Sequence, residues 1–157
     1  MKAKYLILLL ILIATTCALR SQSIYVEFAG RGLFYSINYE HNFSGEISGW
    51  RGQVGMGYLP TSLISIPVSA SYVFGKGSNH LELGGGATYF EGYIWGDDDK
   101  FNPSINVLAT CYYRYQKPNG KFYFKLGVTP TFLEIPLPQR IRFVAVPWAG
   151  IGVGYKF

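Results

Sequence analysis

The side chains best suited to chemistry in this chain are its two histidines, His41 and His80, and three consecutive aspartates at 97–99. A histidine oriented by an acid can activate a serine for acyl transfer, and clustered carboxylates can bind a divalent cation. Each histidine, however, adjoins a short polar turn signal, and Phe101 stands where an EF-hand loop needs a ligand. The sequence therefore predicts turn residues and a solvated acidic loop, with no enzyme activity, no cofactor and no metal site.

A second set of chemically active groups lies within segments where apolar and polar residues alternate. Seven charged side chains fall on the polar face of these segments: Glu27, Glu40, Arg51, Glu82, Arg114, Lys125 and Lys156. The rest of that face is rich in glycine, serine and threonine, as a narrow and crowded interior requires. Because an unpaired ion in such an interior is unfavourable, we expect these seven residues to form a paired charge network in a lumen.

The alternation has a period of two, which is typical of strands and not of helices. It predicts eight strands, at 24–29, 33–40, 50–58, 64–74, 81–89, 105–115, 122–129 and 147–157. The apolar phase flips across Gly30-Arg31-Gly32, which fits either a tight turn between two strands or a glycine bulge in one long strand over 24–43. We favour the turn because it gives an even strand number, as bacterial single-chain barrels have.

The predicted connections differ in length. Short turn signals occupy 44–48, 75–79 and 118–120, whereas longer connections are expected at 95–103 and 133–146. Short turns on one side and longer loops on the other are typical of membrane barrels. Pro67 interrupts the fourth segment, and because proline lacks the N–H that a ladder uses, we expect a local bulge there.

The final strand shows the alternation most clearly. One face carries Ala149, Ile151, Val153, Tyr155 and Phe157, and the other face carries small and polar residues. Since successive side chains point to opposite sides of a strand, the chain ends in an apolar stripe with an aromatic last residue.

Alternation alone leaves open which way the apolar stripe faces. An inward stripe would make a soluble, lipocalin-like barrel around a ligand. Aromatic residues gather toward the ends of the stripes: Tyr58, Tyr72, Phe74, Tyr89, Tyr113, Tyr115, Phe122 and Phe157. Such belts suit the two interfaces of a membrane. The sequence therefore predicts an all-β fold, an eight-stranded antiparallel up-and-down transmembrane β-barrel.

The amino-terminal segment has the features of a secretion signal. Lys2 and Lys4 precede an apolar run at 5–14, which is shorter than the roughly twenty residues of a transmembrane helix. The predicted domains are a signal peptide at 1–22, cleaved near 18–22, and a barrel domain at 23–157. A lipid-modified Cys17 is the alternative, although Thr16 before it departs from that pattern.

The net charge gives no indication of nucleic-acid binding. The chain has a formal net charge of +5, and removing Lys2, Lys4 and Arg20 with the leader reduces it to +2. This charge is small and no basic cluster accompanies it.

With its leader, its alternating strands and its terminal Phe157, the chain resembles small bacterial outer-membrane β-barrels, similar to the OmpX family and the transmembrane domain of OmpA. The glycine- and tyrosine-rich stretch 32–40 resembles uncharacterised small barrels of Bacteroidota. The resemblance implies residence in the outer membrane of a Gram-negative cell, amid lipid and lipopolysaccharide, as a monomer. It also implies that the apolar stripe of the last strand is the signal for the barrel assembly machinery.

An eight-stranded barrel is just wide enough for its own side chains, so a packed interior with a structural or surface-interaction role is expected. The alternatives are a narrow pore, a lipid-modifying enzyme and the lipocalin-like barrel. With both termini in the periplasm, His41 and His80 fall on the periplasmic side, far from the outer leaflet, which argues against the enzyme. Arg140 and Arg142 on the last outer loop are candidates for contacts with lipopolysaccharide phosphates.

Overall fold

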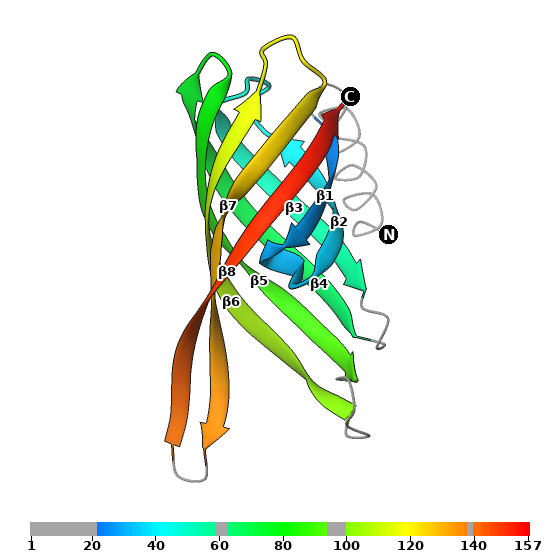
Figure 1. Ribbon diagram of the computed structural model, residues 1–157, viewed down its shortest axis with the longest axis vertical. Coiled ribbons are helices and arrows are strands. Elements are labelled where there is room, and N and C mark those ends of the chain that lie inside the picture. Colours follow the sequence, from blue (N-terminus) through cyan, green and yellow to red (C-terminus); the bar gives the residue numbers. More distant parts are fainter. Residues whose placement is uncertain (1–21, 59–62, 94–99, 138–139) are drawn as a thin grey trace, which may run out of the picture.

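The computed structural model describes residues 22–58, 63–93, 100–137 and 140–157, which form a closed antiparallel barrel of eight strands (Figure 1). The elements are β1 (Gln22–Ala29), the 3₁₀ turn η2 (Gly30–Gly32), β2 (Tyr35–Asn42), β3 (Gly49–Tyr58), β4 (Ile64–Lys76), β5 (Asn79–Tyr93), β6 (Lys100–Gln116), β7 (Phe122–Leu137) and β8 (Arg140–Lys156). Each strand pairs with the next in sequence, and β1 pairs with β8 to close the barrel. Among these residues, no helix is long and apolar enough to span a membrane.

The apolar stripe of each strand faces outward and the polar stripe faces the lumen. In β8, for example, Val153 is 56% exposed, whereas the lumen-facing Lys125 of β7 is completely buried. The interior contains mostly serine, threonine, asparagine, glutamine and charged side chains, while most large exposed side chains are apolar. The outward orientation predicted from the aromatic belts is confirmed, and the lipocalin-like alternative with an apolar interior is wrong.

Aromatic side chains contact one another on several strands at the end of the barrel where Gln22 and the carboxyl terminus lie. Trp50 of β3 contacts Tyr72 of β4 with 5.4 Å between ring centroids, and Phe122 of β7 contacts Tyr155 of β8 at 5.1 Å. Edge-to-face pairs of this kind are favourable beyond the area they cover. They give this rim the amphipathic aromatic belt that membrane interfaces accommodate.

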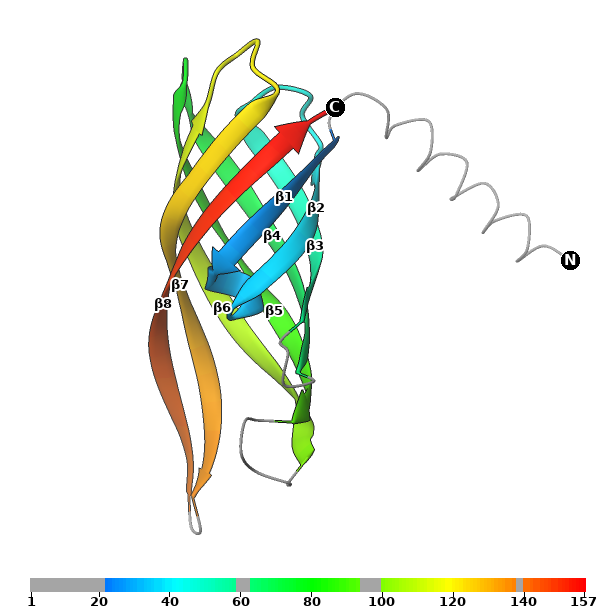
Figure 2. The same cartoon turned by 45° about the vertical axis from the view of Figure 1, so that its right-hand side comes forward.

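The strands on one side of the barrel are much longer than those on the other side. Both views show β7 and β8 continuing as a two-stranded ribbon far beyond the short β1 and β2 (Figures 1 and 2). The ladder between β7 and β8 runs to Leu137–Arg140, whereas β6 pairs with β7 only as far as Phe132. The prediction of a long connection at 133–146 is therefore wrong. Pro136 is tolerated in this ribbon because one edge of each ribbon strand has no described neighbouring strand, and a missing backbone N–H on that edge breaks no ladder.

The connection between β5 and β6 is also shorter than predicted. β6 begins at Lys100, so part of the expected loop at 95–103 is strand. Residues 94–99, with the three aspartates, lie outside the described part of the chain, as do residues 1–21 of the predicted signal peptide.

Pro67 does not create the predicted bulge. The β3–β4 pairs Val54–Val68 and Gly57–Ser65 lie on either side of it in the same register, and Pro67 itself lies opposite Thr88 of β5. The missing N–H interrupts the ladder to β3 but shifts nothing, because the flanking pairs hold the register. The register shift lies instead in β5, between Phe90 and Gly92.

Candidate functional site

The lumen contains one connected group of charged side chains, which we call the lumen ion cluster: Glu27, Arg31, Glu40, Arg51, Glu82, Arg114 and Lys125. Glu40 of β2 is its centre. Its carboxylate accepts from Arg51 Nη1 at 2.9 Å and from Arg114 Nη2 at 2.8 Å, and Lys125 Nζ lies 3.6 Å away. Short charge-assisted hydrogen bonds are among the strongest in proteins, so one buried carboxylate joins three strands.

Glu82 of β5 is the second bridging carboxylate. Arg114 Nη1 donates to it at 3.2 Å, and Gln53 Nε2 donates to it at 2.9 Å. Lys125 Nζ lies 3.5 Å and Arg31 Nη2 lies 3.6 Å from the same carboxylate. Because Glu40 and Glu82 share Arg114, Lys125 and Gln53, the cluster spans the whole width of the lumen.

Three buried tyrosines fill the space between the charges. Lys125 Nζ lies 3.8 Å from the ring centroid of Tyr25, and Arg114 Cζ lies 3.8 Å from that of Tyr123. Arg31 Cζ lies 5.1 Å from the ring centroid of Tyr112. Cations over aromatic faces are stabilised most where water is absent. The tyrosines therefore stabilise the cluster as well as occupying the lumen.

The turn between β1 and β2, residues 30–32, folds into the barrel, and we call it the inward turn (Figure 2). All three of its residues are buried. The flanking Ala29 and Leu33 have positive φ angles of 55° and 74°, which residues other than glycine rarely adopt. Such strain persists only where surrounding contacts impose it. The phase flip is thus a turn between two strands, as favoured from the sequence, and the bulged single strand is excluded.

Strands on the far side of the lumen hold the inward turn. Ser65 Oγ donates to the carbonyl of Gly32 at 3.0 Å, and Thr88 Oγ1 donates to the carbonyl of Arg31 at 2.9 Å. The guanidinium of Arg31 donates to Ser69 Oγ at 2.9 Å. These contacts join β4 and β5 to the β1–β2 turn. The turn therefore closes the lumen on the side of the lumen ion cluster that faces away from the termini.

The structure brings together six of the seven charged residues predicted for the lumen and separates the seventh. Lys156 faces the lumen at the end of β8, but no described carboxylate lies within ion-pair distance of it. Arg31 takes part in the cluster although the sequence offered it only as a turn residue. The signal that could have identified it is its place between two glycines at a phase flip, which allows an inward turn.

The two histidines have separate and local surroundings. His41 packs edge-to-face on Phe43 with 4.9 Å between ring centroids. His80 is buried, with Nε2 3.1 Å from the carbonyl oxygen of Gly77. Both lie at the end of the barrel where the termini lie, as predicted. Among the residues that the structure describes, no three acidic, histidine or cysteine side chains form a metal-binding group.

The closed eight-stranded barrel with an apolar outside and a charged, packed lumen is the architecture of small outer-membrane proteins. The chain is similar to the N-terminal β-barrel domain of OprF from Pseudomonas aeruginosa, with a TM-score of 0.66 and 14% identity over 88% of this chain and 98% of that one. It is also similar to the outer membrane protein Ail of Yersinia pestis in a phospholipid bilayer nanodisc, with a TM-score of 0.51 and 14% identity over 88% of this chain and all of that one.

These likenesses are in fold. No protein-family model matches the chain, and neither does any curated protein. The outer-membrane barrel fold predicted from the sequence, similar to that of OmpX and OmpA, is therefore confirmed at the level of architecture.

Proposed function

We propose that this protein is a monomeric, integral outer-membrane β-barrel with a packed, non-conducting lumen and a structural or surface-interaction role, without catalysis. The observation that carries the proposal is the double closure of the lumen. The lumen ion cluster fills its centre, and the inward turn covers the cluster from the side away from the termini. Opening a water path would break several buried charge contacts at once, each expensive to leave unpaired.

The outward surface supports residence in a membrane. Soluble monomeric proteins rarely expose large, continuous apolar surfaces. Here the exposed side chains on neighbouring strands are repeatedly isoleucine, valine, leucine or aromatic, as Ile151 and Val153 of β8 illustrate. The same stripe of Ala149 to Phe157 is the proposed signal for the barrel assembly machinery. The likeness of 32–40 to barrels of Bacteroidota stays a prediction.

The ribbon formed by β7 and β8 supports a role at the outer surface. It extends from the end of the barrel opposite the termini, which is the outer end if the termini are periplasmic (Figure 1). Past Phe132 of β7 and its partner Ala145 of β8, no other described strand pairs with the ribbon, so backbone N–H and C=O groups line both of its edges. Exposed strand edges can pair with another chain. Arg140 and Arg142 belong to this ribbon, and contact with lipopolysaccharide phosphates is proposed for them.

Planar-bilayer recording tests the closed lumen. The purified, refolded protein is expected to give no steady single-channel steps under conditions in which a general porin, added as a positive control, conducts. Steady steps of one amplitude would refute the proposal and favour the narrow pore. Mass spectra of lipid A from cells with and without the gene test the remaining alternative, and an altered acylation pattern would establish a lipid-modifying enzyme.

A further inference from the structure

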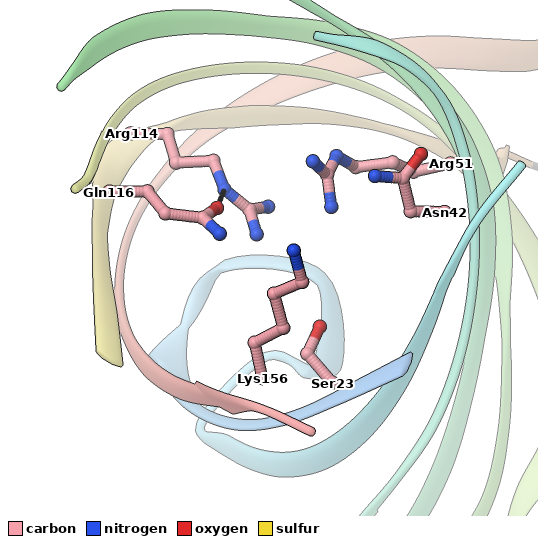
Figure 3. A pocket seen from close by; sticks show the side chains of 6 residues that line it. All are labelled: Ser23, Asn42, Arg51, Arg114, Gln116 and Lys156. Carbon is pink, nitrogen blue, oxygen red and sulfur yellow. Dashed lines mark hydrogen bonds between the residues drawn. The ribbon is translucent and has the colours of Figure 1, made fainter. Parts of the chain in front are cut away.

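The lumen mouth beside the termini contains a small polar cavity, which we call the mouth pocket (Figure 3). Its lining comes from five strands and consists of Ser23, Asn42, Arg51, Arg114, Gln116 and Lys156. The cavity measures about 10 Å³, which is room for about one water-sized group. Figure 3 shows the Lys156 amine pointing between the guanidinium groups of Arg51 and Arg114.

The mouth pocket has more positive charge than its surroundings compensate. Arg51 and Arg114 both pair with Glu40, which also lies within ion-pair distance of Lys125, and Arg114 pairs with Glu82 as well. Among the described residues, no carboxylate lies within ion-pair distance of Lys156. Across the described lumen, five cations (Arg31, Arg51, Arg114, Lys125 and Lys156) face three carboxylates (Glu27, Glu40 and Glu82). The described lumen therefore has an excess of two positive charges, and three of its five cations (Arg51, Arg114 and Lys156) line the mouth pocket.

Arg51 adds an unmet hydrogen-bond donor. Its Nη1 donates to Glu40 and its Nη2 donates to the carbonyl of Ile47, but its Nε is buried without a hydrogen-bond partner. The whole residue is only 4% exposed, so bulk water does not compensate fully. A buried donor without an acceptor is unfavourable by roughly 1–3 kcal/mol. Arg51 also lines the mouth pocket, so an acceptor oxygen that entered it would be favoured by the positive charge of this guanidinium group.

We infer that the mouth pocket binds an oxyanion, a phosphate or carboxylate group that places one oxygen between Arg51, Arg114 and Lys156. The size of the cavity matches a single oxygen atom of such a group. Gln116 is held in place by Arg114 Nε at 2.9 Å and fixes the guanidinium plane. This inference goes beyond the proposed function, because a closed lumen requires no ligand at its mouth.

Inorganic phosphate is the first probe. Purified protein in a phosphate-free maltoside detergent at low ionic strength is titrated calorimetrically, and saturable binding is expected. Lys156→Gln removes one cation from the pocket and is expected to weaken binding about tenfold, which corresponds to roughly 1.4 kcal/mol. Lys156→Arg keeps the charge and should retain binding. Lys117→Gln changes a lysine in an exposed turn at the same end and is the matched control, with unchanged affinity expected.

The outcomes separate the possibilities. Heat-dependent gel mobility first establishes that each variant is folded. Absence of saturable phosphate binding to the wild type would overturn the inference, as would equal losses in Lys156→Gln and Lys117→Gln. Phosphatidylglycerol added to the micelles identifies the source. Competition with phosphate would assign the pocket to a lipid headgroup, whereas competition by acetate alone would assign it to a soluble carboxylate.

Discussion

Replacing Glu40 by glutamine tests the lumen ion cluster at its centre. The amide has nearly the same volume but loses the negative charge. Both carboxylate oxygens now accept from cations: Oε1 from Arg51 and Arg114, and Oε2 from Arg114 at 3.0 Å. Whichever position the new NH₂ group occupies, it therefore faces a positively charged donor.

The expected effect follows from the burial of these groups. Glu40 is completely buried, and Arg51 would lose its only described carboxylate partner. Removing one member of a buried ion pair typically destabilises a protein by about 3–5 kcal/mol, because the remaining charge is uncompensated. We expect Glu40→Gln to lower the free energy of unfolding by about that amount.

The assay is reversible urea unfolding in lipid vesicles, followed by tryptophan fluorescence and gel mobility. Glu46→Gln, in the exposed turn after β2, is the control and should change the unfolding free energy by about 0.5 kcal/mol or less. The double variant Glu40→Gln/Arg51→Met should lose less than the sum of its single variants, since it removes the stranded cation. If Glu40→Gln unfolded with the same free energy as Glu46→Gln, the reasoning about the cluster would be refuted.

Three further changes test other parts of the barrel by the same unfolding assay. Gly150→Ala would place a methyl group against the Tyr112 hydroxyl and 3.0 Å from Gly30 Cα, so about 1–3 kcal/mol of destabilisation is expected. Gly152→Ala is the control: it lies two positions along the same face, the nearest contact of its methyl group would be at 3.4 Å, and its effect should be nearly neutral. Val153→Arg puts a charge on the apolar outside, where the cost is about 2–4 kcal/mol at the bilayer midplane and smaller toward the interfaces. Destabilisation within that range is expected for Val153→Arg but not for Asn119→Arg in an exposed turn. Equal assembly of both variants would reverse the assignment of the faces. Thr88→Val leaves the carbonyl of Arg31 without its donor and should cost about 1–3 kcal/mol, with faster amide exchange in the inward turn; unchanged exchange would show that β5 does not hold the turn.

The sequence predicted the strands well because facing is determined locally. In β4 to β6, apolar and polar residues alternate over many positions, so the sequence alone assigns each residue to one of the two faces of the strand. A register slip of one residue would reverse every side chain, so such strands have little freedom. The same alternation placed Glu40, Glu82, Arg114 and Lys125 on the lumen face.

The errors arose where neighbouring strands, and not the local sequence, decide the structure. A connection was expected at 133–146, a stretch that contains Pro136, but Pro136 lies in a two-stranded ribbon beyond the wall, and one edge of its strand has no described neighbour there. Pro67 predicted a bulge, but the pairs on both sides hold the register. Arg31 was overlooked because an inward turn depends on acceptors and donors on β4 and β5, far away in sequence. Lys156 was expected in the charge network because alternation shows that a residue faces the lumen, but not how far along the lumen it lies.

Gel mobility of the outer-membrane fraction, compared between boiled and unboiled samples, tests the central claim most directly. A closed barrel that spans the outer membrane is expected to appear in that fraction and to migrate differently until SDS and heat unfold it. Glu40→Gln should lose the unheated mobility at a lower temperature than Glu46→Gln. A protein found in the soluble periplasmic fraction, with one mobility at all temperatures, would contradict the account.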